Sequence, residues 1–393
     1  MRKKILFFCI PAHGHTNPTL GVVRELTARG HKVWYYSYEL FREKIEAAGA
    51  HFVSCDAYDA EQKLKPEDGA RVANDLGFST KLLVDTTLAL DEQVSQDIQR
   101  IQPDCIVADS MAVWGKAAAF KHGIPFVSST TTFAFNRYSA RDMKQSPKQL
   151  LSMLFSMPRI QREIKRLQKR GYPFKNVLDI IANDDQTHTI VYTSPQFQPC
   201  SDTFSNRYAF VGPIIRPPVG AVEKRKEKLI YISMGTVNND QLAFYQKCIE
   251  AVSGMNVQTI LSVGELVDTE RLKPLPENIE VYRYVDQMAV LAKADAFLTH
   301  CGMNSASEAL YHGVPLVMHP QTAEQGAVAA RAEQLGAGVR LVKETPTDIC
   351  TALEKALYKP AYRSCAQQIG AGFRQCNGAK GAADKILQMC KAN

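Results

Sequence analysis

The feature that most constrains the fold is a repeated order of short apolar run, polar loop, helical segment and second apolar run. Residues 4–10 are predicted to form a buried strand, 13–17 a loop, 18–29 a helix that opens with Pro18, and 33–36 the next strand. A helix between two strands serves as a crossover, and crossovers connect parallel strands. The start of the chain therefore predicts a parallel α/β sheet.

The same order recurs along the chain and restarts after a basic segment that contains proline. Residues 216–228 have the Pro, Gly and charge content of a linker. At 393 residues the chain is longer than a single hydrophobic core usually supports, so two domains are expected. Further strands are predicted at 105–108, 125–127, 190–192, 210–213, 229–233, 258–263, 279–282, 296–299 and 316–318, with helices over 240–253 and from 304 onward.

We expect two Rossmann-like, doubly wound domains that face each other across a cleft. The first would cover 1–215 and the second 229–375, joined by the linker 216–228. Residues 376–393 are predicted to form a C-terminal helix that packs back towards the first domain. Ligands of open α/β sheets bind beyond the carboxyl ends of the strands. That rule directs attention to the loops at 11–17, 234–238 and 300–305.

Composition and charge favour a cytoplasmic enzyme over other classes of protein. The net charge is +7, but Lys and Arg are mostly scattered, so no nucleic-acid partner is expected. The ten cysteines show no metal-ligand or disulfide pattern, which indicates free thiols. No apolar run approaches the ~20 residues of a membrane span. The first apolar run leads directly into Pro11 without a signal-peptide cleavage site.

One stretch departs from the even distribution of charge. Residues 141–175 contain ten Lys or Arg and only two acidic residues, with several large apolar residues among them. We interpret it as a helix with a solvated face over a small-molecule site, because charge runs usually face water. Weak peripheral contact with a membrane is the alternative.

The loop after the strand at 296–299 has the features of an anion site. His300 ends the strand, Gly302 allows a ligand to approach the backbone, and a helix follows. The helix N-terminus would present free N–H groups, and the Ser305 hydroxyl could add to them. Glu308 lies one turn into the helix, where a carboxylate can accept hydrogen bonds from a ribose. An ordinary helix cap made by Asn304 or Ser305 would explain the same residues.

The run His-Cys-Gly-Met-Asn-Ser-x-x-Glu at 300–308 resembles the donor-binding signature of the nucleotide-sugar glycosyltransferases with the two-domain GT-B fold. The resemblance continues through 309–315, Glu324-Gln325 and Tyr-Val-Asp-Gln at 284–287, and it includes Pro-Ala-His-Gly-His-Thr-Asn-Pro at 11–18. Bacterial macrolide glycosyltransferases are the most similar group. The resemblance spans nearly the whole chain and implies a UDP-sugar donor.

The resemblance also implies a role for each matching residue of the second domain. Tyr284 takes the place of the usual Trp that stacks on uracil, and Asp286 replaces a usual Pro, which we expect to loosen that loop. Glu324 replaces the common Asp. Pyrophosphate would be held by Thr236, His300, Gly302, Asn304 and Ser305, the base by Tyr284 and Val285, the ribose by Glu308, and the sugar by Glu324 and Gln325. Gln287 is a further predicted donor-binding residue.

The loop at 11–17 offers a candidate catalytic base. A histidine can take the proton of a hydroxyl near neutral pH, and a carboxylate beside it stabilises the imidazolium that forms. A structural hydrogen bond is the alternative for any loop histidine. The resemblance assigns the base to His15 and its partner to Asp109, which ends a predicted strand. It implies inverting transfer, and the absence of an Asp-x-Asp motif leads us to expect neither a metal nor a cofactor.

The acceptor would be a hydrophobic small molecule with hydroxyl groups, such as a macrolide or a polyphenol. UDP-glucose is the default donor that the resemblance implies. A UDP-sugar epimerase of the same fold and a non-catalytic nucleotide-binding partner of another transferase are the alternatives. Retention of His15 and Asp109 argues against both of them. Candidate acceptor contacts are His13, Phe78, Phe133, Phe135 and Met143.

Overall fold

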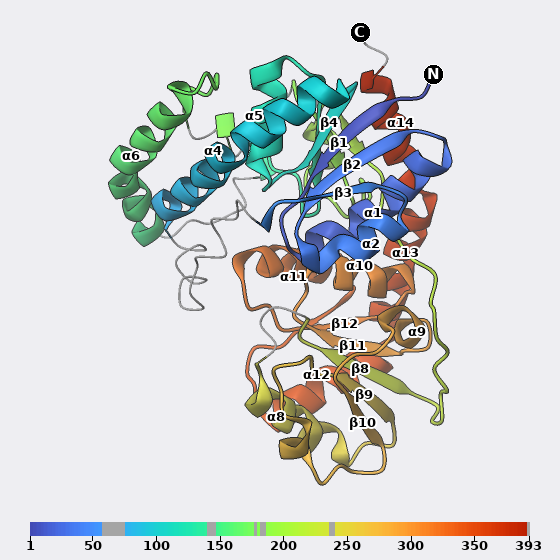
Figure 1. Cartoon of the computed structure of the whole chain (residues 1–393). Coiled ribbons are helices and arrows are strands. Elements are labelled where there is room, and N and C mark those ends of the chain that lie inside the picture. The colour runs from blue at the N-terminus through green and yellow to red at the C-terminus, as the bar shows by residue number, and fades with distance from the viewer. Residues whose placement is uncertain (57–74, 140–146, 177–178, 181–185, 236–239, 391–393) are drawn as a thin grey trace. The chain divides into compact units, whose positions relative to one another are not determined.

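The computed structural model describes residues 1–56, 75–139, 147–176, 179–180, 186–235 and 240–390, with the backbone alone for 147–155 (Figure 1). By its internal contacts the chain forms two compact units. Unit 1 contains Met1–Tyr192, Cys200–Val211 and Asn377–Asn393. Unit 2 contains Thr193–Pro199 and Gly212–Cys376.

Unit 1 is built on a seven-stranded sheet in which every pair of neighbours is parallel. The order reverses between β1 and β4, which is therefore the topological switch point of this sheet. In spatial order the strands are β3 (His51–Ser54), β2 (Lys32–Ser37), β1 (Lys4–Phe8), β4 (Cys105–Asp109), β5 (Phe126–Thr130), β6 (His188–Val191) and β7 (Tyr208–Phe210).

Helices cover both faces of this sheet, which explains why β4 is buried throughout. They are α1 (His13–Ala28), α2 (Arg42–Ala47), α4 (Leu76–Ile101), α5 (Val113–His122), α6 (Pro147–Gln168) and α14 (Gly378–Cys390), with short 3₁₀ segments η1 (Glu39–Phe41) and η5 (Ser201–Thr203). The last helix, α14, lies beside α1, and Arg29 Nη1 is 2.5 Å from Asp384 Oδ1 (Figure 1).

The first helix begins earlier than the sequence predicts. Residues 13–17 are its opening turn rather than a loop, and Pro18 lies in the second turn rather than at the start. Pro18 removes one N–H bond of the helix and its ring disfavours the position. Burial of Leu20, Val23 and Leu26 against the sheet outweighs that cost. The candidate base His15 therefore lies on a helix.

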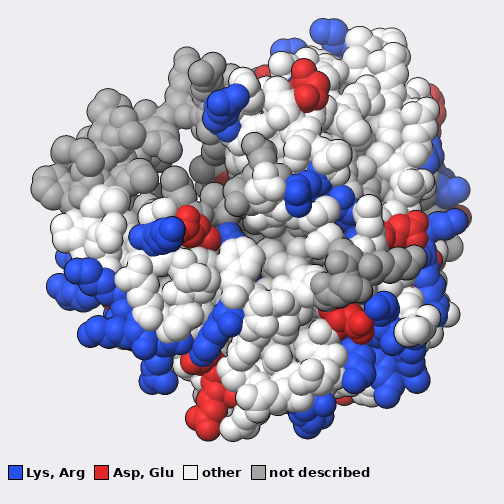
Figure 2. All heavy atoms as spheres, turned by 90° about the horizontal axis from the view of Figure 1, so that it is seen from above, with Lys and Arg blue, Asp and Glu red and all other residues white. Residues whose placement is uncertain are grey.

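The exposed face of α6 bears out part of the interpretation of 141–175. Ile160, Ile164 and Leu167 are buried against Val84 of α4. Arg162 belongs to the opposite, exposed face, and Lys and Arg side chains gather on this flank of unit 1 (Figure 2). Among the residues that the structure describes, no helix is long and apolar enough to cross a membrane.

Unit 2 is built on a six-stranded parallel sheet. Its order reverses between β8 and β11, so its switch point lies there. In spatial order the strands are β10 (Ile279–Tyr282), β9 (Gln258–Ser262), β8 (Leu229–Ser233), β11 (Ala296–Thr299), β12 (Leu316–Met318) and β13 (Gly338–Arg340). The helices are α8 (Leu242–Ser253), α9 (Gln287–Leu291), α10 (Met303–Tyr311), α11 (Ala323–Gln334), α12 (Pro346–Tyr358) and α13 (Pro360–Gln375), with the 3₁₀ segment η6 (Thr269–Leu272).

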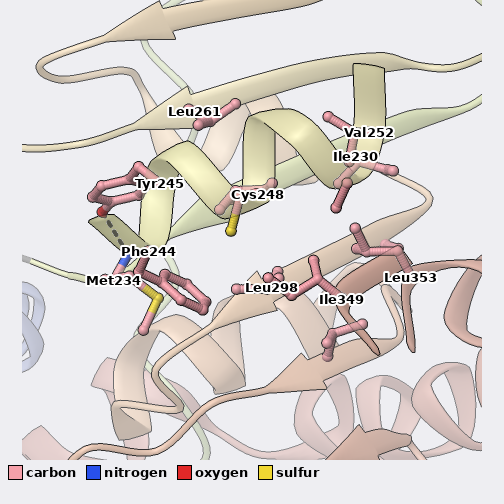
Figure 3. Close-up of a cluster of buried hydrophobic side chains, with 14 of the residues drawn as sticks. Ile230, Met234, Phe244, Tyr245, Cys248, Val252, Leu261, Leu298, Ile349 and Leu353 are labelled. Carbon is pink, nitrogen blue, oxygen red and sulfur yellow. Dashed lines mark hydrogen bonds between the residues drawn. The ribbon is translucent and has the colours of Figure 1, made fainter. Parts of the chain in front are cut away.

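The core of unit 2 also fixes the loop that leaves β8. Helices α8 and α12 pack their apolar sides onto the sheet around Cys248 and Leu298 (Figure 3). Tyr245 of α8 is buried, and its hydroxyl accepts a hydrogen bond from the Met234 N–H at 3.2 Å. The same hydroxyl donates to the Ser262 carbonyl at 3.3 Å. The exit of β8 is thus tied to the core.

Two strands were not predicted, and one was predicted too late in the chain. Strand β3 is short and only partly buried, so it lacks an apolar run. Strand β13 opens with Gly338, where a Cβ would lie 2.1 Å from the Leu316 carbonyl oxygen. Strand β7 covers 208–210 instead of 210–213. Contact between neighbouring strands, rather than local pattern, decides these segments.

Candidate active site

The switch point of unit 1 brings a histidine and a carboxylate together. His15 is the third residue of α1, and Asp109 is the last residue of β4. His15 Nδ1 lies 2.8 Å from Asp109 Oδ2, and the Asp109 side chain is fully buried. Asp109 Oδ1 accepts a hydrogen bond from the Met111 N–H at 2.8 Å. The carboxylate is therefore fixed on both oxygens, as an orienting partner of a base must be.

A threonine that the sequence did not single out completes this arrangement. Thr131 follows β5, and its Oγ1 lies 3.0 Å from His15 Nδ1. With a carboxylate also at 2.8 Å, Nδ1 must carry the proton, because two lone pairs would repel at that distance. In that tautomer Nε2 of His15 carries no proton and is the nitrogen that can accept one. The hydroxyl-rich run 128–132 at a strand exit was the available signal.

The other predicted residues of unit 1 have different surroundings. The His13 ring packs edge-to-face on Phe41 at 5.0 Å. Burial, together with the charge of Lys44, lowers the pKa of His13. His13 is thus part of the packing between α1 and η1.

The aromatic side chains predicted to contact the acceptor substrate differ in how exposed they are. Phe133 is 3% exposed, whereas Phe135 is 47% exposed and offers apolar surface. Phe78 is half-buried in the first turn of α4, and Met143 lies outside the described residues. Met111, which the sequence reading missed, is 49% exposed directly beside Asp109.

At the switch point of unit 2 a histidine lies between two glycines. A Cβ on Gly235 would be 2.6 Å from His300 Cε1, and one on Gly302 would be 2.6 Å from its Nε2. Gly235 also has a φ of +84°, which disfavours other residues. Burial lowers the pKa of His300 to about 4, and the backbone of Ser233 opposes this shift only in part. His300 is therefore neutral at physiological pH.

The turn from β11 into α10 leaves the helix N-terminus open. Cys301 is fully buried with a φ of +63°, and its N–H donates to Thr299 Oγ1 at 3.2 Å. Gly302 is the N-cap, and a glycine has no side chain with which to cap this end, whereas Asn304 and Ser305 lie inside the helix. The alternative of a cap made by Asn304 or Ser305 is therefore wrong. Free N–H groups at such a terminus favour a diphosphate.

Gln287 is hydrogen-bonded to two of the other predicted donor-binding residues. Its Nε2 donates to Ser305 Oγ at 3.3 Å and to Glu308 Oε2 at 2.6 Å. Its Oε1 accepts from the Tyr231 hydroxyl at 3.3 Å. Burial raises the pKa of Glu308, and the hydrogen bond from Gln287 opposes that shift. The first turns of α9 and α10 are thus linked through one amide.

The predicted base-binding loop is anchored, contrary to expectation. Tyr284 is 57% exposed, as a stacking platform must be. Asp286, expected to loosen the loop, instead binds Arg216 and two backbone N–H groups. A carboxylate can accept several hydrogen bonds where the usual proline accepts none with its side chain. Tyr284, Val285 and Asp286 line a cavity of about 420 Å³.

The predicted sugar-binding pair lies in the first turn of α11. Thr322 caps this helix, and its Oγ1 accepts from the Gln325 N–H at 3.3 Å. Gln325 Oε1 accepts from the Gln321 N–H at 2.8 Å, so this side chain is held by its own turn. Glu324 is exposed. The predicted phosphate contact Thr236 lies outside the described residues.

Comparisons with known proteins identify the family of this chain. A family model described as erythromycin biosynthesis protein CIII-like, C-terminal domain, matches residues 246–381. The uncharacterized UDP-glucosyltransferase YojK of Bacillus subtilis (strain 168) is 31% identical over 98% of this chain and 97% of its own length. The oleandomycin glycosyltransferase of Streptomyces antibioticus is 29% identical, covering 97% of this chain and 90% of its own.

Solved structures show the same architecture. The structure of the glycosyltransferase of kitacinnamycin matches with a TM-score of 0.84 at 26% identity, covering 99% of both chains. Two parallel-sheet α/β units, together with relatives of this kind, define a GT-B glycosyltransferase. The chain belongs to the nucleotide-sugar-dependent glycosyltransferase family that contains the bacterial UDP-glucosyltransferases and macrolide glycosyltransferases.

Proposed function

We propose that this protein transfers a hexose from a UDP-sugar to a hydroxyl of a hydrophobic small molecule, with inversion at the anomeric carbon and His15 as the general base. The observation that carries the proposal is the 2.8 Å contact between His15 Nδ1 and the buried Asp109 carboxylate. This contact fixes the tautomer in which Nε2 can accept a proton.

In the proposed reaction the acceptor hydroxyl loses its proton to His15 Nε2 as its oxygen forms a bond to C1 of the sugar. The bond from C1 to the UDP oxygen breaks on the opposite side, so one displacement inverts the anomeric centre. The imidazolium is stabilised by Asp109. No residue of the chain is bonded to the sugar at any point.

The charge that develops on UDP would be stabilised by unit 2. The open N-terminus of α10 offers N–H groups and the positive end of the helix dipole. Neutral His300 can donate one hydrogen bond, and we assign Asn304, Ser305 and Thr236 to the same diphosphate. Because these groups supply the stabilisation that a metal supplies in other transferases, we propose that the reaction needs no metal ion.

UDP-glucose is the donor that we propose. The relative YojK is named a UDP-glucosyltransferase, which supports this choice. Exposed Tyr284 would stack on uracil, and the backbone of Val285 would contact the edge of the base. Glu308 would accept hydrogen bonds from the ribose hydroxyls. Glu324 and Gln325 would bind the sugar hydroxyls.

The acceptor that we propose is a macrolide or a polyphenol. One relative is named an oleandomycin glycosyltransferase, which supports an acceptor of this kind. In unit 1 Met111 and Phe135 expose apolar surface that suits a flat, hydrophobic molecule.

The test is a mass-spectrometric screen of UDP-glucose and other UDP- and dTDP-sugars against a panel of macrolides and polyphenols. We expect a product heavier by one hexose, formed with UDP-glucose and equally fast in the presence of EDTA. Nuclear magnetic resonance should show a β-linked product from the α-linked donor. Donor hydrolysis without any glycosylated acceptor, or retention of the α configuration, would refute the proposal.

A further inference from the structure

Asp286 lies outside the proposed substrate contacts, yet three hydrogen bonds hold it. It precedes α9, and its Oδ1 accepts from Arg216 Nη2 at 2.5 Å. Its Oδ2 accepts from the backbone N–H groups of Val219 at 2.6 Å and Gly220 at 3.1 Å. All three donors belong to the segment 216–220, about seventy residues earlier in the chain. One carboxylate thus ties this segment to the loop 284–287.

The loop that Asp286 anchors contains the residues proposed to meet the nucleotide. Tyr284 and Val285 precede it directly, and Gln287 follows it. Gln287 is itself hydrogen-bonded to α10 through Ser305 and Glu308. The loop is therefore held on one side by 216–220 and on the other by the helix whose N-terminus we assign to the diphosphate.

The charged pair Arg216 and Asp286 lies close enough to Glu308, a predicted donor-binding residue, to influence its pKa. The Asp286 side chain is 19% exposed and that of Arg216 is 44% exposed, so water screens this pair in part, and the two backbone hydrogen bonds add to it. Burial would raise the pKa of Asp286, but Arg216 and the two N–H groups outweigh it and lower the pKa to about 2. The charges of Arg216 and Asp286 also act, in opposite directions, on the pKa of Glu308.

The segment that Asp286 holds forms a wall beside the same loop. The cavity of about 420 Å³ is lined on one side by Gly220, Ala221 and Val222 and on another by Tyr284 and Val285. Without the carboxylate the direct tie between 216–220 and the loop would be lost, while Glu223 and Arg225 would still be held by Gln258. An unanchored loop would have to be ordered when the nucleotide binds, which weakens binding.

We propose that Asp286 is a positioning residue for the nucleotide, which holds Tyr284 and Val285 in their binding arrangement by fixing 216–220 against their loop. The inference rests on the proposed function, since it takes this loop as the site of the UDP base. We assign Asp286 no contact with donor or acceptor, because both of its carboxylate oxygens are taken by 216–220. Its loss therefore reduces donor affinity and leaves the chemical step unchanged.

The experiment measures UDP binding by isothermal titration calorimetry for the wild type, Asp286→Ala and Arg216→Met. We expect Asp286→Ala, which removes all three hydrogen bonds, to bind UDP about tenfold more weakly. Arg216→Met leaves the two backbone bonds and should weaken UDP about threefold. In both variants kcat at saturating donor and KM for the acceptor should stay within about twofold of the wild type.

Lys224→Met provides the matched control. Lys224 belongs to the same segment between the two sheets, and its Nζ lies 2.6 Å from Asp295 Oδ2. Asp295 directly precedes β11, at the amino edge of the sheet, away from the loop 284–287. The control should lower Tm about as much as Arg216→Met and leave the Kd for UDP unchanged.

The outcomes separate the inference from the proposed function. Wild-type protein that binds no UDP would refute the proposed donor, and the inference would fall with it. Wild-type binding that Asp286→Ala retains in full would overturn the inference alone. Equal weakening by Arg216→Met and Lys224→Met would also overturn it, because it would show a general loosening of unit 2 and not a positioning role.

Discussion

The two switch points of this molecule each carry a histidine, and the two histidines have opposite surroundings. His15 in unit 1 has a buried carboxylate 2.8 Å from its Nδ1. His300 in unit 2 lies between Gly235 and Gly302, and burial lowers its pKa to about 4. Both residues follow strands of a parallel sheet at the point where the strand order reverses.

The difference shows how one topology supports two kinds of chemistry. A switch point provides a crevice at the carboxyl edge of the sheet, but it does not choose the groups placed there. In unit 1 a carboxylate at the end of β4 contacts His15, and in the proposed reaction it would stabilise the positive charge on that ring. In unit 2 two glycines and an uncapped helix surround a histidine that stays neutral and can only share hydrogen bonds.

The largest expected effect comes from removing the base. His15→Ala should lower kcat about a thousandfold, because the acceptor must then lose its proton to water. UDP affinity should not change, since His15 belongs to unit 1. Steady-state kinetics and calorimetry together test this prediction, with Asp109→Asn as the matched variant that keeps the side-chain shape. Turnover of His15→Ala within tenfold of the wild type would contradict the assignment of His15 as the general base.

The next effect concerns the charge state of His300. The unfolded chain binds a proton at the ordinary pKa of 6.5, whereas the folded chain does so only near 4. Stability from this residue is therefore complete above pH 6.5 and is lost as pH falls towards 4, by about 3 kcal/mol in total.

Urea denaturation of the wild type and His300→Gln across this range measures the difference between the two proteins. The variant should lack this component of the pH dependence, because glutamine does not titrate. Other groups, such as Glu308, titrate in both proteins and cancel in the difference. Parallel curves for the two proteins from pH 7 to 4 would contradict the neutral state of His300.

A smaller effect is expected from filling the space beside His300. The Cβ of Gly302→Ala would lie 2.6 Å from His300 Nε2, so the ring would have to move. Displacement of a packed group costs roughly 1–3 kcal/mol, which corresponds to roughly 5- to 150-fold in UDP affinity if the whole cost falls on the bound state. Calorimetry with UDP checks the value. Gly254→Ala is the control, because Gly254 also has a negative φ and a Cβ there meets nothing within 4 Å. Unchanged UDP binding would place the diphosphate elsewhere.

The smallest expected effect concerns the contribution of Thr131 to orienting His15 in unit 1. Thr131→Val keeps the shape of the side chain but removes the hydroxyl 3.0 Å from His15 Nδ1. Since Asp109 still orients the ring, kcat should fall only about threefold, with KM for UDP-sugar unchanged. A loss as large as that of Asp109→Asn would mean that threonine and aspartate share the orienting role equally.

Several features of the site could be predicted from local sequence alone. The position of His300, Gly302 and Glu308 at the start of a helix follows from a strand, a glycine and a helical segment in order. Asp109 at the end of its strand is predictable in the same way. By contrast, the start of α1 at His13 was missed, because tertiary burial overrode the local signal of Pro18.

The sequence by itself determined the two parallel α/β units, the carboxyl-edge loops and the residue types that they carry, because strand and helix periods and turn residues are local properties. Only the tertiary structure decided that Thr131 joins His15, that Asp286 anchors 216–220, and that His300 loses its basicity. These properties depend on which strands become neighbours and how deeply a ring is buried. Contacts between residues tens of positions apart have no local signature, so they appear only once the sheets are assembled.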